Sequence, residues 1–300
     1  MRIAKAAGIA ALGCVATAVA LSGCSPSEAD GADAGTPAKS AAKPAGAEKI
    51  TVDGQSVNVS CAGTSDAGEP VVLLLAGLGD DLTKFADIQK TLSEDRKVCS
   101  FDRLGQGASD KPKGPQDFAA VDKVVTGVID HVAADNPVVL VGHSFGGLIT
   151  GRYAPDHTDK VKGVMLLDAT SPTVVADTQA VIPESAEGPA AQLRQQIVAV
   201  AEGQNPEMLA TPDGAVKSAG DIPVRVIQHG KPYLEQATPE YGKQLEKAWQ
   251  AGQKKWLKLS GNSTLQTAEN SAHHIYLDEP ELVVEAIEDL VEEVDEKVAE

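Results

Sequence analysis

Apolar residues along the chain follow two alternating patterns, short continuous runs and segments with helical spacing. The run Val71–Leu75, bounded by Pro70 and Gly77, predicts a strand that is covered on both faces. Further strands are predicted at 97–101, 138–141, 161–167, 224–227 and 264–267. Helical spacing is found at 82–92, 118–134, 144–153, 239–256 and 280–298. This alternation predicts an α/β fold with a doubly wound, mostly parallel sheet.

Two segments depart from this alternation of strands and helices. Residues 49–60 read as two short strands around Asp53-Gly54, a dipeptide that favours a tight hairpin turn. Between 169 and 221, Pro-rich and Thr-rich connections surround one amphipathic stretch at 190–201. We expect the second segment to be an inserted lid within a single domain that spans 49–300.

The beginning of the chain has the pattern of an export signal. Arg2 and Lys5 precede an apolar run at 9–21, which is shorter than the ~20 residues of a membrane-spanning helix. The run ends in Leu-Ser-Gly-Cys, which resembles the bacterial lipobox and implies a signal peptide at 1–23 and a lipid on Cys24. Residues 24–48 would then be the lipidated Cys and a flexible linker, and the exported protein would be anchored to the outer face of the cell membrane. An ordinary secretory signal with an incidental Cys is the alternative.

Charge and cysteine content bear on the binding partners of the protein and on the pairing of its cysteines. The net charge of -17 at pH 7 disfavours binding to nucleic acid, and the lipid is the only membrane contact that we expect. Of the 4 cysteines, Cys14 would leave with the signal and Cys24 would carry the lipid. Cys61 and Cys99 remain, each beside a predicted strand and outside any Cys-x-x-Cys spacing. In an exported domain this predicts a disulfide between them.

The most informative segment is 138–147, Val-Val-Leu-Val-Gly-His-Ser-Phe-Gly-Gly, where a predicted buried strand meets a Gly-x-Ser-x-Gly turn and a helix. Gly142 and Gly146 allow a sharp turn that exposes the Ser144 hydroxyl at the edge of the sheet. The N-terminus of the following helix offers amide donors and positive potential to an oxyanion. A strand, such a turn and a helix are the context of a nucleophile elbow, formed here by Gly142, His143, Ser144 and Gly146. This context predicts that Ser144 is a nucleophile.

This segment and others resemble the α/β-hydrolase fold family, and the resemblance covers 49–300. Ala-Gly-Leu-Gly at 76–79 stands where family members usually have His-Gly-x-Gly, which implies that the amides of Leu78 and Phe145 form an oxyanion hole. The Ala in place of His departs from the family, but the backbone supplies the donors. The turn Asp-Arg-Leu-Gly-Gln-Gly-Ala-Ser at 102–109 resembles the family's Asp-x-x-Gly-x-Gly-x-Ser turn, and we interpret it as scaffold.

The resemblance also points to a catalytic base near the end of the chain. The segment 270–280 looks like the family's Ser-Gly-His segment after the last strand, and His273 matches the catalytic His. Such a base is required because a serine hydroxyl is a poor nucleophile until its proton is taken. His274 is the fallback for this base, and His143, inside the elbow, is interpreted as a packing or pocket-lining residue.

A catalytic triad also needs an acid that orients the His base, and the sequence assigns this acid less directly than it assigns Ser144 and His273. Many family members place it after the strand that follows the insertion, but 228–232 contains no carboxylate there, and Glu235 is the nearest one. Asp168 lies at the carboxyl end of the strand that follows the elbow, where catalytic groups of open α/β sheets gather. Some branches of the family, haloalkane dehalogenases among them, use that position. We predict that Asp168 is the acid, and a loop-forming or helix-capping Asp is the alternative.

An activated serine, a His base, an acid and two amide donors predict acyl transfer to water through an acyl-enzyme. We therefore expect a serine hydrolase that cleaves carboxylic esters and takes a small-molecule acyl substrate. Thioesters, lactones, N-terminal peptide bonds and perhydrolysis use the same groups, and a non-catalytic ligand-binding lipoprotein is the alternative of a different class. The chain has no His-x-His or His-Glu-x-x-His cluster, so we expect no metal and no cofactor.

Overall fold

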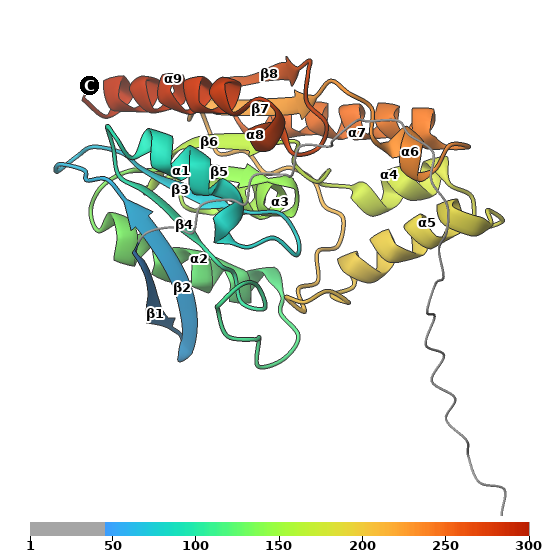
Figure 1. Ribbon diagram of the computed structural model, residues 1–300, viewed down its shortest axis with the longest axis horizontal. Helices are drawn as coiled ribbons and strands as arrows, with labels where there is room; N and C mark the ends of the chain where they lie inside the picture. Colours follow the sequence, from blue (N-terminus) through green and yellow to red (C-terminus); the bar gives the residue numbers. More distant parts are fainter. Residues whose placement is uncertain (1–45, 300) are drawn as a thin grey trace, which may run out of the picture. The chain divides into compact units, whose positions relative to one another are not determined.

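Eight strands form one sheet in the computed structural model, which describes residues 46–299 (Figure 1). The strands are β1 (Ala47–Val52), β2 (Gln55–Ala62), β3 (Val71–Leu75), β4 (Val98–Phe101), β5 (Val138–His143), β6 (Val161–Leu167), β7 (Val224–His229) and β8 (Ser263–Ala268). Their order across the sheet is β1-β2-β4-β3-β5-β6-β7-β8. The pairs β1–β2 and β2–β4 are antiparallel, and the remaining pairs are parallel. The predicted doubly wound, mostly parallel sheet is confirmed.

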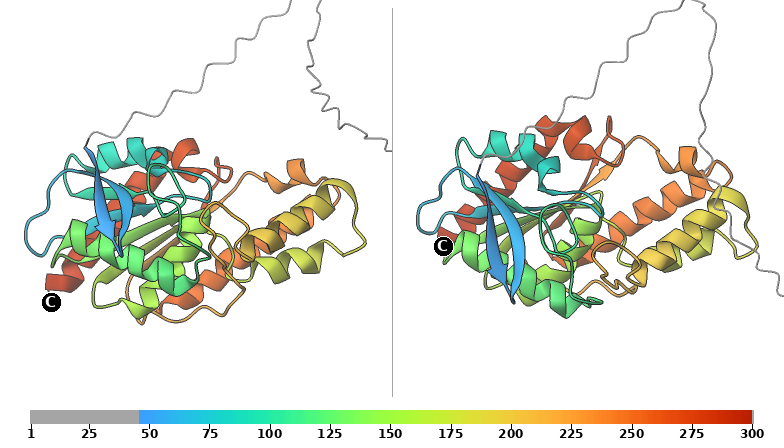
Figure 2. Two further views of the ribbon diagram at one scale, coloured as in Figure 1. Left: turned by 90° about the horizontal axis from the view of Figure 1, so that it is seen from below. Right: turned by 60° about the horizontal axis from the view of Figure 1, so that its bottom comes forward.

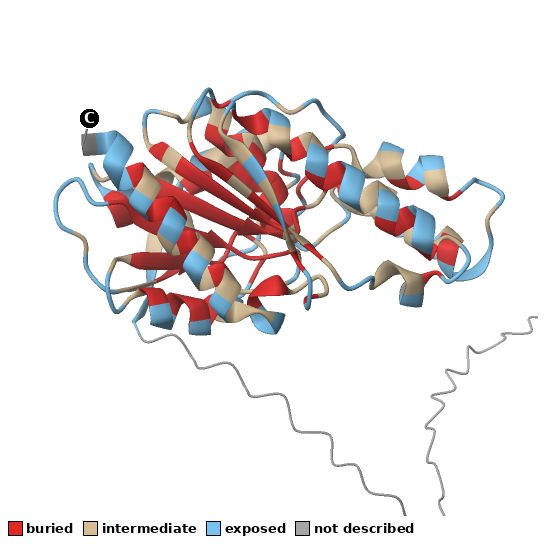
Figure 3. Ribbon diagram, turned by 90° about the horizontal axis from the view of Figure 1, so that it is seen from above, coloured by how far each residue is buried: buried red, intermediate tan, exposed pale blue. Residues whose placement is uncertain are grey.

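Helices cover both faces of this sheet (Figure 3). They are α1 (Ala86–Leu92), α2 (Phe118–Ala133), α3 (Ser144–Tyr153), α4 (Val174–Val181), α5 (Gly188–Ala201), α6 (Leu234–Ala237), α7 (Gly242–Trp256), α8 (Ile275–Asp278) and α9 (Pro280–Ala299), with the 3-10 turns η1 (Leu82–Phe85), η2 (Ala154–Asp156) and η3 (Leu257–Leu259). Helices α2 and α3 pack on one face, and α1 and α9 pack on the other.

Strand β3 shows how the sequence builds these two layers. Val71, Leu73 and Leu75 point into the core under α2 and α3, whereas Val72 and Leu74 point into the core under α1 and α9. Side chains alternate along a strand, so a strand that is buried on both faces must be apolar at every position. The continuous apolar run in the sequence is therefore the direct signature of this central place in the sheet.

The structure differs from the expected helices at several places. The helical segment expected at 82–92 begins as the 3-10 turn η1, and the helix expected from 239 begins at Gly242 as α7. The short helices α6 and α8 were not predicted. Helix α4 was not predicted at all. Its apolar residues pack on α5 and α7 rather than on the sheet, so its eight residues carry no long periodic stripe that sequence reasoning could detect.

The segment between β6 and β7 leaves the layers of the sheet. It contains α4 and α5, which lie beside α7 at the end of the molecule away from the hairpin β1–β2 in every view (Figure 2). The chain then returns along the core: Leu209 forms an isolated β-bridge with Gln116, and its neighbour Ala210 bridges to Glu202. The bridge to Gln116 thus joins the returning part of the insertion to the main body.

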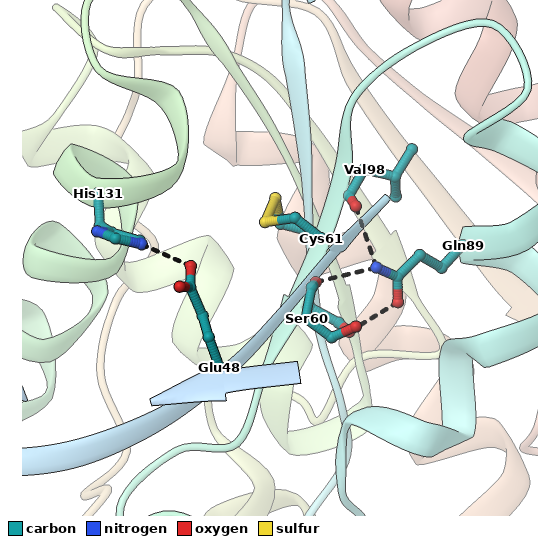
Figure 4. The surroundings of a disulfide bond; sticks show 8 residues. Glu48, Ser60, Cys61, Gln89, Val98 and His131 are labelled. Atoms are coloured by element: carbon teal, nitrogen blue, oxygen red, sulfur yellow. Dashed lines mark hydrogen bonds and ion pairs between the residues drawn. A yellow bond between two sulfur atoms is a disulfide. The ribbon is translucent and has the colours of Figure 1, made fainter. Parts of the chain in front are cut away.

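Cys61 and Cys99 are joined by a disulfide, as the sequence predicts (Figure 4). They are direct partners in the register of β2 and β4, with a Cα–Cα distance of 4.1 Å. On the neighbouring positions, the Gln89 amide donates to the carbonyl oxygens of Ser60 (2.9 Å) and Val98 (3.1 Å), which ties α1 to the same two strands. The antiparallel edge of the sheet is therefore fixed both covalently and by side-chain hydrogen bonds.

The first strand begins at Ala47, two residues before the expected start of the domain. Cys24, the signal peptide and most of the linker lie outside the described residues. Between residues 46 and 299, none of the helices combines the length and the apolar character that a membrane span requires.

Candidate active site

The turn between β5 and α3 places Ser144 in a left-handed backbone conformation, with φ of +51°. Such a conformation costs about 1–3 kcal/mol for a residue with a side chain and persists only where its surroundings enforce it. A Cβ atom on Gly146 would lie 2.3 Å from the Leu75 carbonyl oxygen, and one on Gly142 would lie 2.6 Å from the Gly146 carbonyl oxygen. Both positions therefore require glycine, and the tight packing of the turn holds Ser144 in its strained geometry.

Three side chains from distant parts of the sequence form a hydrogen-bonded line. His273 Nε2 lies 2.9 Å from Ser144 Oγ, and His273 Nδ1 lies 2.6 Å from Asp168 Oδ2. Ser144 follows β5, Asp168 follows β6, and His273 lies in the loop after β8. Because these strands are parallel, their carboxyl ends meet at one edge of the sheet, and the three side chains converge there.

Asp168 is fully buried and ionised. Burial by itself would raise its pKa, but the hydrogen bonds and charges of His229 and His273 hold that pKa far below its usual range. Asp168 Oδ1 also accepts hydrogen bonds from Trp249 Nε1 (2.8 Å) and from the backbone amide of His229 (3.2 Å). The carboxylate is thus oriented by donors on two sides, which fixes the oxygen that faces His273.

The partners of Asp168 on its far side were not predicted from the sequence. His229 Nδ1 lies 2.9 Å from each Asp168 oxygen, and His229 Nε2 lies 2.8 Å from Glu246 Oε2. His229 ends β7 and Glu246 lies in α7, so 61 residues separate His229 from Asp168 along the chain. The only available signal was that the strand at 224–227 led into a histidine where a carboxylate was expected.

Leu78 and Phe145 lie beside Ser144, as the oxyanion prediction requires, and all three line one cavity. Phe145 is in the first turn of α3, where amides have no partner within the helix. The Gly77 carbonyl oxygen accepts from Gln106 Nε2 (2.8 Å) and Arg103 Nη2 (3.3 Å). In a planar trans peptide the N–H points away from the preceding C=O, so these two side chains aim the Leu78 amide in the opposite direction.

Arg103 connects this loop to the insertion. Its guanidinium donates to the Ala76 carbonyl oxygen (2.6 Å) and forms two bonds to the Glu207 carboxylate, Nε to Oε2 at 2.8 Å and Nη2 to Oε1 at 2.7 Å. The Arg103 and Glu207 side chains are 2% and 1% exposed. The turn at 102–109, which we interpreted as scaffold, therefore also positions the loop that carries Leu78.

The cavity beside Ser144 has a volume of about 220 Å³ and is mostly apolar. Its lining residues come from the elbow, the Leu78 loop, α4, α5, α7 and the two ends of the insertion: Leu78, Ser144, Phe145, Thr170, Val174, Leu193, Gln196, Ile197, Val200, Ala201, Thr211 and Trp249. None of these described residues is charged at neutral pH. Val174, Leu193 and Ile197 also line a second, smaller cavity that continues between α4, α5 and α7.

The other two candidate residues from the sequence occupy different places. His143 Nε2 donates to the His273 carbonyl oxygen (2.9 Å), and its pKa falls to about 3 because it is buried and lies beside His273. His143 thus packs under the loop of His273 as a neutral ring. His274 lies with its ring centroid 5.3 Å from that of His273, and within the described chain neither His274 nor Glu235 hydrogen-bonds to Ser144 or His273. Residues 46–299 contain no group of three or more His, Cys, Asp and Glu side chains arranged to hold a metal ion.

Parts of this chain are similar to known proteins. The sequence model of the alpha/beta hydrolase fold family matches residues 70–206. The chain is 24% identical over 219 residues to the uncharacterized protein YqjL of Bacillus subtilis, which covers 73% of this chain and 82% of that protein. Other relatives match over shorter parts: the chain spans 17% of an uncharacterized protein of Schizosaccharomyces pombe (34% identical) and 29% of a human (lyso)-N-acylphosphatidylethanolamine lipase (30% identical).

Solved structures share the fold along most of the chain. An esterase from Thermogutta terrifontis superposes with a TM-score of 0.57 at 19% identity, over 84% of this chain and 100% of its own. An enol-lactonase from Burkholderia xenovorans superposes with a TM-score of 0.55 at 19% identity, over 81% of this chain and 99% of its own. At this level of identity the likeness shows a common fold, and the arrangement of Ser144, His273 and Asp168 is the observation on which the chemistry depends.

Proposed function

Since this chain is a hydrolase of the α/β-hydrolase fold family, we propose that it is a serine hydrolase that cleaves carboxylic esters through an acyl-enzyme on Ser144. The observation that carries the proposal is the line from Ser144 through His273 to the ionised Asp168, at the mouth of an apolar cavity. A hydroxyl, a base and a buried anion in this order are the groups that nucleophilic acyl transfer needs.

The first half of the reaction forms the acyl-enzyme. His273 Nε2 takes the proton of Ser144 Oγ as that oxygen attacks the acyl carbon, and the amides of Leu78 and Phe145 bind the oxyanion that develops. Asp168 remains ionised and stabilises the imidazolium of His273. The imidazolium then gives its proton to the leaving alcohol as the bond from carbon to that oxygen breaks.

The second half releases the acid. His273 takes a proton from water, the hydroxide attacks the acyl carbon, and the bond to Ser144 Oγ breaks as the proton returns to that oxygen. Thioesters, lactones and N-terminal peptide bonds can react with the same groups, and hydrogen peroxide in place of water gives perhydrolysis. We favour esters because the apolar lining of the cavity suits an acyl chain and offers no charged group to bind a peptide terminus.

We also propose that α4 and α5 form a lid over the site. Both helices contribute to the lining of the cavity beside Ser144, through Val174 from α4 and Leu193 and Ile197 from α5. Such a lid would exclude water from the acyl-enzyme until the alcohol has left.

A fluorophosphonate probe and a panel of nitrophenyl esters, thioesters and peptide amides test the proposal. We expect labelling of the wild type, hydrolysis of esters ahead of amides, and loss of both in Ser144→Ala. Ser93→Ala, at the end of α1, is the matched control and should behave as the wild type. A folded wild type that neither reacts with the probe nor cleaves any ester would instead indicate a ligand-binding protein.

A further inference from the structure

Asp168 has a second histidine on the side away from His273. His229 Nδ1 faces both Asp168 oxygens at 2.9 Å, and His229 Nε2 faces Glu246 Oε2 at 2.8 Å. His229 is 1% exposed and Asp168 is 0% exposed, and Glu246 is also buried. The hydrogen-bonded line therefore continues beyond the triad, from Asp168 through His229 to Glu246.

The number of protons on His229 and Glu246 determines which hydrogen bonds these side chains can form. A neutral imidazole carries one N–H, so one of its two nitrogens would present a lone pair to a carboxylate oxygen. That contact would be repulsive, and in a buried place it would be costly. The pair of His229 and Glu246 must therefore hold one additional proton. The carboxylates of Asp168 and Glu246 raise the pKa of His229, although burial opposes them, which favours an imidazolium between two carboxylates.

The other groups around His229 do not neutralise it. Trp249 from α7 and Tyr233, which precedes α6, pack on its ring with centroid distances of 6.5 and 5.0 Å. Burial raises the pKa of the Tyr233 phenol far above its usual value, so this group stays neutral. The charges that His229 experiences are thus those of Asp168, Glu246 and, during catalysis, His273.

We propose that His229 and Glu246 are positioning residues that orient Asp168 and, through the positive charge on His229, lower the basicity of His273 so that the enzyme remains active in more acidic solution. The inference rests on the proposed function. A cation beside Asp168 weakens the field with which that carboxylate stabilises the His273 imidazolium. Glu246 lies on the far side of His229 and offsets only part of this effect, because His229 stands between it and Asp168.

Two variants test this role by charge rather than by shape. In Glu246→Gln the amide can donate to His229 Nε2, so His229 becomes neutral while its hydrogen bond to Asp168 remains. In His229→Asn the amide nitrogen takes the place of Nδ1 and the charge is lost. In both, His273 should become more basic, and the acidic limb of kcat/KM for a nitrophenyl ester should move to higher pH by about one unit. The double variant should show no larger shift than His229→Asn, because both changes remove the same charge.

The effect on His273 can also be measured without turnover. The pKa of His273, followed by NMR in Ser144→Ala and in the same protein with Glu246→Gln, should rise by a similar amount. Glu235→Gln, which removes a carboxylate from neighbouring α6, is the matched control and should leave the acidic limb of the pH profile of kcat/KM unchanged. A wild type without esterase activity would defeat the proposed function. The inference alone would be defeated by an active wild type whose acidic limb stays fixed or moves to lower pH in both variants, or by a His273 pKa that Glu246→Gln does not raise.

Discussion

The buried ion pair between Arg103 and Glu207 gives the sharpest test of how the insertion supports the site. Glu207→Gln keeps the shape of the side chain but removes its charge, and it turns one acceptor of the guanidinium into a donor. Because Arg103 and Glu207 are 2% and 1% exposed, water cannot replace the lost partner. Breaking a buried pair in this way costs about 3–5 kcal/mol, a large part of the ~5–15 kcal/mol by which a domain is stable.

Urea unfolding followed by circular dichroism measures this loss as a lower transition midpoint. Asp156→Asn is the matched control, since the pair of Lys217 and Asp156 is 64% and 57% exposed and should contribute no more than about 1 kcal/mol. A change of less than about 1 kcal/mol in Glu207→Gln, no larger than in the control, would refute the reasoning from burial.

The double variant Arg103→Met with Glu207→Met separates stability from activity. Apolar residues of similar volume can replace a buried ion pair with little loss of stability, so the urea midpoint should recover. Activity should not recover, because the guanidinium no longer holds the carbonyls of Ala76 and Gly77 away from the oxyanion. Losing one oxyanion donor lowers kcat by about 10²–10³. Recovery of full kcat in the double variant would show that Arg103 does not orient that loop.

Three further predictions concern the triad, the anchor and pH. Asp168→Asn should lower kcat by about 10⁴ in protein that circular dichroism shows to be folded, while the kcat of Glu235→Gln should stay within about tenfold of the wild type. An inactive Glu235→Gln would instead indicate that Glu235 is the acid. Cys24→Ala should shift the protein from the membrane fraction to the soluble fraction in a bacterial host, and unchanged partitioning would end the lipid-anchor proposal. Burial lowers the pKa of His143 in the folded protein to about 3, whereas its pKa in the unfolded chain is ~6.5. The stability that the neutral ring provides is therefore complete above pH 6.5. It is lost as the pH falls towards 3, by up to ~1.4 kcal/mol per pH unit. His143→Gln should remove that part of the slope in urea unfolding between pH 6.5 and 4.5, and an unchanged slope would contradict the assignment.

The sheet and the elbow could be predicted from the sequence alone. Strand β3 and the buried parts of β5 and β6 at 138–141 and 164–167 are covered on both faces, so each appears as an uninterrupted apolar run. The glycines around Ser144 are equally local signals, because the turn that needs them spans only a few residues. The candidate Asp168 could be named for a related reason: it follows directly on β6, and parallel topology carries the end of that strand to the edge where Ser144 lies.

The tertiary structure decided what surrounds these residues. Arg103 and Glu207 are 104 positions apart, and Asp168 and His229 are 61 positions apart. None of these four belongs to a periodic pattern that marks its partner, because a hydrogen bond or an ion pair between single side chains leaves no trace in local hydrophobic spacing. Helix α4 escaped prediction because it packs on α5 and α7 rather than on the sheet. Local patterns specify elements and turns, whereas the charges that tune a buried carboxylate are known only when the chain has brought them together.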